Sequence, residues 1–232
     1  MRGFGAVAAA AVVGLAACSD SAVGPSTPRG LAPADAPSLD ISVSSWGYRT
    51  VTFTLTSDGG TYNIGSFYTL TVPADGVCSL KSSYGPGTWD SACQTLGKNE
   101  TITVTATYGY SNGGPVVDFS PALRFNPAAQ VTLSTMLYAP ILTAAKGYFS
   151  KNPSALGFFG MYYTPNLGSS LVSDAASDPS VATHVNLTTG LVWRRVKHFS
   201  GYNVSAGEAC DPADGDPNCV EVPPIVEGGG NP

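Results

Sequence analysis

The stretch TVTFTLT, residues 50–56, alternates threonine with larger apolar residues. Successive side chains of a β-strand point to opposite faces of a sheet, so the alternation predicts a strand with one buried face. The stretch TITVTAT, residues 101–107, repeats the pattern. The apolar positions of the two stretches are Val51, Phe53, Leu55, Ile102, Val104 and Ala106.

Other segments extend this pattern along the chain. SFYTLTVP, VVDF, QVTLSTML, VATHVNL, GLVWRRV and GYNVS have strand character, and turn-forming stretches such as SDGGT, SNGGP and LTTG separate them. Closely spaced short strands are typical of a sandwich, so we predict an all-β fold, a single antiparallel β-sandwich. In YAPILTAAKGYFSK, residues 138–151, we expect one short turn of helix.

The composition agrees with one globular domain. The chain has 232 residues, of which 43% are hydrophobic and 12% are charged. This is enough apolar material for a core in one or at most two domains. The formal net charge of -5 argues against a nucleic-acid partner, which requires a basic surface.

The N-terminus has the features of an export signal. Arg2 precedes a short apolar run that ends in VVGLAACSDS, residues 12–21. The run is too short to span a bilayer as a helix and is typical of a secretory signal peptide. Its end, Leu15 to Cys18, resembles the lipobox of bacterial lipoproteins. An ordinary signal peptide that happens to contain a cysteine is the alternative.

The lipobox resemblance implies a membrane anchor. Cleavage before Cys18 would make it the first residue of the mature protein, with acyl chains such as palmitate attached. Each buried CH₂ group contributes about 0.8 kcal/mol, so two or three chains hold firmly. Ser19 follows in place of aspartate, which favours the outer membrane over the inner one. The membrane is therefore an expected partner, through the lipid at Cys18.

The predicted domain organisation follows from composition. Residues 1–17 are the lipoprotein signal peptide, and residues 18–40 are a flexible Pro/Ser/Ala-rich tether. The β-sandwich covers residues 41–207. Residues 208–232 form an acidic, Gly/Pro-rich and mobile tail.

Four cysteines remain after Cys18, namely Cys78, Cys93, Cys210 and Cys219. Outside the cytoplasm this number predicts two disulfides, for which three connectivities exist. We favour the local pairs Cys78–Cys93 and Cys210–Cys219, because each brackets a loop rich in turn-forming residues. Metal ligation by these cysteines is not expected, since the chain has no Cys-x-x-Cys motif.

The middle of the chain resembles a known module. FYTLTVPADGVCSL, ETITVTATY and GPVVDFSPALRFNPAAQVTLS are similar in order and spacing to the β-sandwich domain shared by zonula occludens proteins, netrin receptors and ankyrins. VKHFSGYNV, residues 196–204, is similar to its closing strand. The insert SSYGPGTWDSAC departs from the family. The resemblance implies a binding and scaffolding domain without catalytic residues.

An acidic loop is a candidate calcium site. CDPADGDPNC places Asp211, Asp214, Asp216 and Asn218 close together in the chain. Oxygen ligands at this density suit Ca²⁺, although the EF-hand spacing is absent. The alternative is a solvated acidic loop.

Two other stretches are candidate binding surfaces. RRVKH gathers Arg194, Arg195 and Lys197, which would meet an anionic ligand, or else would guard an edge strand by charge. The aromatic stretch around Tyr148, Phe158 and Tyr162 would stack on sugars or seat a protein, or else would pack inside the sandwich.

The sequence does not predict an enzyme. It has no Gly-x-Ser-x-Gly, His-Glu-x-x-His or phosphate-loop motif, and no cofactor is expected. We therefore expect an envelope lipoprotein that acts as a binding or structural module, with an envelope protein or glycan as partner. The alternatives are a glycan-active hydrolase and a calcium-dependent adhesion module.

Overall fold

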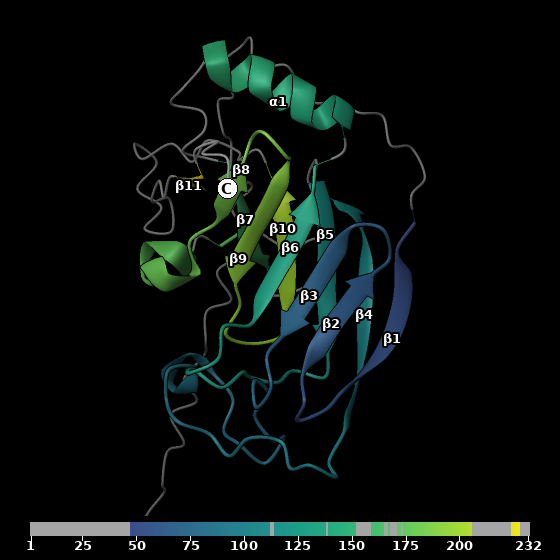
Figure 1. Ribbon diagram of the computed structural model, residues 1–232, viewed down its shortest axis with the longest axis vertical. Helices are drawn as coiled ribbons and strands as arrows, with labels where there is room; N and C mark the ends of the chain where they lie inside the picture. The colour runs from purple at the N-terminus through teal and green to yellow at the C-terminus, as the bar shows by residue number, and fades with distance from the viewer. Residues whose placement is uncertain are drawn as a thin grey trace, which may run out of the picture.

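The computed structural model consists of two β-sheets packed face to face (Figure 1). It describes residues 47–111, 114–137, 139–151, 159–164, 167, 171–172, 174–205 and 224–227. The predicted all-β sandwich is confirmed.

The first sheet has five strands in the order β1-β4-β5-β10-β7. All of its neighbouring strands are antiparallel. The strands are β1 (Arg49–Leu55), β4 (Ile102–Ser111), β5 (Gly114–Ser120), β10 (Gly201–Ser205) and β7 (Gly160–Thr164).

The second sheet has six strands in the order β11-β8-β9-β6-β3-β2. Its pairs are antiparallel except for the short parallel pair of β11 with β8. The strands are β11 (Ile225–Val226), β8 (His184–Asn186), β9 (Leu191–Arg195), β6 (Thr132–Met136), β3 (Tyr68–Val72) and β2 (Gly60–Ile64). Strand β11 lies within the segment that the composition assigns to the tail.

The two threonine-alternating stretches pair with each other, as β1 and β4. Phe53 stands opposite Val104, and Thr52 stands opposite Thr105. The apolar positions therefore face the second sheet and the threonines face outward, as the alternation predicts.

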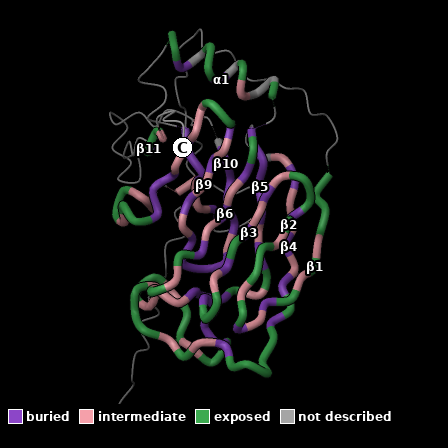
Figure 2. The backbone as a smooth tube through the Cα atoms, viewed as in Figure 1, coloured by how far each residue is buried: buried purple, intermediate pink, exposed green. Residues whose placement is uncertain are grey.

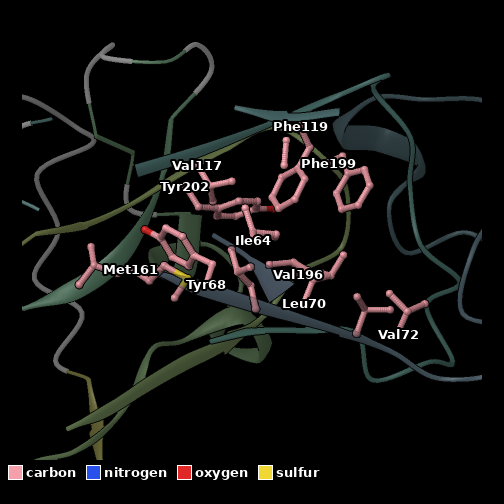
Figure 3. Packing of buried hydrophobic residues seen from close by; sticks show 14 of the residues in the cluster. Ile64, Tyr68, Leu70, Val72, Val117, Phe119, Met161, Val196, Phe199 and Tyr202 are labelled. Atoms are coloured by element: carbon pink, nitrogen blue, oxygen red, sulfur yellow. The ribbon is translucent and has the colours of Figure 1, made fainter. Parts of the chain in front are cut away.

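The core fills the space between the sheets (Figures 2 and 3). Leu70 of β3 is fully buried, as are Val104 of β4 and Val192 of β9. At the end near the loop that follows β3, Phe119 and Phe199 stack with ring centroids 4.3 Å apart. Both sheets thus contribute one apolar face to a single core.

Helix α1 (Ala139–Lys151) crosses one end of the sandwich (Figure 1). Its 13 residues correct the expectation of one short turn. Ala145 and Phe149, four residues apart and hence on one helix face, are buried. The full helix was not predicted because glycine and aromatic residues, such as Gly147 and Phe149, have low helix propensity. The Gly-rich turn signal likewise concealed β2.

In the candidate aromatic stretch, the described phenylalanines follow the second of the two expectations and pack inside the domain. The described part of the aromatic stretch is divided between α1 and β7. Phe149 and Phe159 pack against each other in the core, with ring centroids 5.6 Å apart. Tyr162 of β7 is partly buried, which raises its pKa to about 12. The exposed shelf therefore does not extend over these described aromatics. Phe158, and the side chain of Tyr148, lie outside the described part of the structure.

Candidate functional site

The disulfide Cys78–Cys93 is present, which confirms this predicted pair. It closes a loop at the end of the sandwich opposite to α1 (Figure 1). Cys210 and Cys219 lie outside the described residues, as do Cys18 and the candidate calcium loop. For the described part of the chain, no three His, Cys, Asp or Glu side chains gather as a metal site.

Arg124 fixes the disulfide loop to the sandwich. Its Nη1 donates to the carbonyl oxygens of Thr88 and Ser91, each at 2.6 Å. Its Nη2 donates to the carbonyl oxygen of Ala92 at 3.2 Å. A guanidinium has five N–H donors in a planar arrangement, which suits it to several carbonyls of one turn. The loop is therefore a structured part of the domain.

The basic stretch RRVKH does not form a surface strip. Arg194 is 1% exposed, and β9 lies between β8 and β6 and so is not an edge strand. Its guanidinium binds Asp174 in a bidentate manner, with Nη1–Oδ1 and Nη2–Oδ2 distances of 2.9 and 2.6 Å. Alternation does place Arg194 inward and Arg195 outward. The expectation of an open anion-binding strip is wrong, because the side chain that points inward is neutralised within the fold.

Lys197 is neutralised as well. Its Nζ is 2.5 Å from Oδ1 of Asp90 in the disulfide loop and also pairs with Asp178. Burial lowers the pKa of Lys197, but the two carboxylates outweigh it and leave the pKa raised. The partly exposed Arg195 donates to the carbonyl oxygens of Pro127 and Ala129. All three cations of the stretch therefore have partners within the domain.

His198 lies under the disulfide loop. Trp89 stacks on its ring with centroids 3.7 Å apart, and Tyr84 and Tyr163 contact it edge-on. Ser200 Oγ is 3.1 Å from Nδ1. A Ser–His pair is the minimal arrangement for nucleophilic catalysis, but His198 is 3% exposed and a substrate needs access to the pair. This histidine therefore has a structural role.

The enclosure of His198 predicts a pH dependence of stability. Burial is the largest cause that lowers its pKa from 6.5 to about 4. A group whose pKa falls on folding contributes stability that is complete above pH 6.5 and lost as the pH falls toward 4. Urea unfolding between pH 7 and pH 4 is expected to show an added slope of up to about 1.4 kcal/mol per pH unit. The same titration of His198→Gln lacks this part of the slope; an unchanged slope contradicts the prediction.

The outer face of the six-stranded sheet has a different character. Trp193 of β9 points outward, and its ring stacks on His184 of β8 with centroids 3.8 Å apart and an interplanar angle of 12°. Trp193 Nε1 donates to Glu227 Oε1 at 3.0 Å. The same carboxylate oxygen is 3.4 Å from His184 Nδ1. The indole is thus held in one orientation while it remains partly exposed.

A groove of about 370 Å³ lies beside this tryptophan. The outward-facing residues that line it are Asn63, Thr69, Ser134, Met136 and Leu191. Ser134 stands directly opposite Trp193 in the β6–β9 pair. Trp193 is thus the cross-strand neighbour of a residue that lines the groove. We call the groove together with the adjacent indole the outer groove.

A turn at residues 65–67 forms the rim of the outer groove. Gly65 has a φ of 59°, and a Cβ there would lie 2.3 Å from the ring of Tyr108. Glycine is therefore required by both backbone conformation and space. A second hollow of about 110 Å³, which includes Arg49 and Tyr108, shares Ser66 and Phe67 with the groove.

Comparisons with protein-family models, with curated proteins and with solved structures give no match for this chain. The resemblance to the module of zonula occludens proteins stays a prediction. Among the described residues, no helix has the length and hydrophobicity of a membrane span.

Proposed function

We propose that the protein is a lipid-anchored binding module of a bacterial cell envelope. The observation that carries the proposal is the Cys78–Cys93 disulfide, set in a loop whose contacts make it part of the domain. Structural disulfides form and persist outside the reducing cytoplasm. The lipobox ending at Cys18 supports export and anchoring in the same compartment.

A binding function is favoured over catalysis because the charged and titratable side chains that catalysis would require contact other groups inside the fold. Arg194, Lys197 and His198 are committed to partners inside the fold. The residues that line the outer groove are neutral, and the His184 and Glu227 side chains beside it hold the indole of Trp193 in place. Such a surface suits recognition. The resemblance to scaffolding modules points the same way.

Lipidation of Cys18 is directly testable. Cells grown with a clickable palmitate analogue are expected to label the protein, and intact mass should correspond to a chain that begins at an acylated Cys18. The Cys18→Ser variant should lose the label and leave the membrane fraction, because the acyl chains are its anchor. An unmodified mass that begins at Met1 in membrane-associated protein contradicts the proposal.

A further inference from the structure

We propose that the outer groove binds a neutral polysaccharide chain. The inference rests on the proposed function, since it names the ligand of that binding module. Its support is the shape of the groove, the chemistry of its lining and the fixed indole of Trp193.

The shape suits a chain-like ligand. The groove passes from Leu191 and Met136, across the outer face of β6 and β3, to the turn at residues 65–67. The second hollow continues past Ser66 and Phe67 toward Arg49. The two hollows meet at the turn of residues 65–67 and together pass from β9 and β6 to β1 and β4, whereas a pocket for a single small molecule encloses most of its ligand. A polymer that enters and leaves at the two ends fits this form.

The lining suits a ligand rich in hydroxyl groups. Asn63 has an amide that both donates and accepts hydrogen bonds, and Thr69 and Ser134 add hydroxyls. Thr69 Oγ1 donates to Asn63 Oδ1 at 3.3 Å, which orients the amide. The apolar surface of Met136, which is 58% exposed, lies among them. Sugars present the same combination of hydroxyl groups and C–H surfaces.

The charge of the lining selects an uncharged ligand. Every residue that lines the groove itself is neutral, although the chain carries 11 lysine and arginine and 16 acidic residues. Recognition of phosphate, sulfate or carboxylate groups uses arginine or lysine as partner. Arg194 and Lys197, the two buried cations of RRVKH, are paired inside the fold. An acidic polysaccharide therefore has no matching cation among the residues that line the groove; Arg49 lies in the second hollow, beyond the turn at residues 65–67.

Trp193 supplies a stacking surface next to the groove. Its indole is positioned before a ligand arrives, by the bond to Glu227 and the stack on His184. A side chain that is already ordered loses less conformational entropy on binding, which increases affinity. An indole has a large apolar face and can contact the C–H face of a sugar ring. Trp193 and the hydroxyl of Ser134, opposite it, would then contact the same sugar.

The test is affinity electrophoresis of the full chain, extracted in mild detergent. Native gels contain hydroxyethylcellulose, laminarin or soluble starch as neutral probes, or polygalacturonate as the acidic probe. We expect retardation by at least one neutral probe and none by polygalacturonate. Asn63→Ala and Trp193→Ala are expected to weaken the retardation at least tenfold. Asn63 is exposed, so its replacement preserves the fold even if loss of Trp193 disturbs it.

The matched control is Thr52→Ala, on the outer face of the other sheet, which should leave retardation unchanged. Absence of retardation by all three neutral probes overturns the inference. So does equal retardation by polygalacturonate, or retardation that both groove variants retain. Lipid labelling at Cys18 is a separate measurement, so loss of the glycan inference is distinguishable from failure of the proposed function.

Discussion

Replacement of Arg194 by alanine is expected to lower the free energy of unfolding by about 3–5 kcal/mol, because it leaves a partly buried carboxylate without its partner. Arg194 is 1% exposed and joins three elements. Besides the bidentate pair with Asp174, its Nη1 donates to the carbonyl oxygen of Met161 in β7 at 2.7 Å. Its Cζ lies 5.5 Å from the centroid of the Tyr202 ring in β10. The side chain thus connects the two sheets.

Burial lowers the pKa of Arg194, but Asp174 outweighs it, so the guanidinium stays charged. Removing one partner of such a pair costs far more than replacing both with apolar residues. Urea unfolding of Arg194→Ala, Asp174→Leu and Arg194→Met/Asp174→Leu measures this difference. The double variant should recover most of the stability lost in Arg194→Ala.

The matched control is Arg49→Ala, an exposed arginine at the start of β1, which should change stability by less than about 0.5 kcal/mol. Equal losses in Arg194→Ala and Arg49→Ala would show that the interior pair contributes nothing. Strictly additive losses in the Arg194/Asp174 cycle would show the same for the coupling between the two groups.

Strand positions were predictable because alternation depends on local geometry alone. TVTFTLT and TITVTAT became β1 and β4, paired along their whole apolar faces. Alternation also predicts Arg194 and Arg195 on opposite faces, as β9 has them, but it predicts Lys197 on the face of Arg195, whereas Lys197 follows the end of the strand and is buried. Alternation does not reveal that the inward arginine pairs with Asp174. That contact depends on the tertiary fold, which brings a residue 20 positions earlier in the chain next to β9. The cluster of basic residues therefore predicted an anion-binding surface, whereas in the folded protein Arg194 forms an internal ion pair with Asp174.

The outer groove was missed for a related reason. The alternation of GLVWRRV places Leu191, Trp193 and Arg195 on one face, which is a usable signal for an outward tryptophan. What lies beside Trp193 depends on sheet order, which brings β6 and β3 next to β9. Periodicity contains no information on sheet order. The adjacent aromatic residues instead predicted a binding surface at Tyr162, which is partly buried.

Loss of the Cys78–Cys93 disulfide should have the second large effect. The cysteines are 15 residues apart, and closing a loop of that length stabilises a fold by about 3 kcal/mol in the chain-entropy model. We expect Cys78→Ala/Cys93→Ala to lose about this amount in urea unfolding. The loop also carries Trp89 against His198, so quenching of tryptophan fluorescence by acrylamide should increase in the variant.

The control is Cys210→Ala/Cys219→Ala, which removes the second predicted pair. The loop that this pair would close is shorter, so in the same model it would contribute less to stability. Thiol labelling of the native chain tests whether Cys78 and Cys93 are bonded. No reactive thiol is expected at either position before reduction. A free thiol at either position would contradict the bond. Unchanged stability after removal of the disulfide would mean that the contacts of Arg124 and Lys197 hold the loop without it. The disulfide would then indicate an oxidising compartment but would not stabilise the fold.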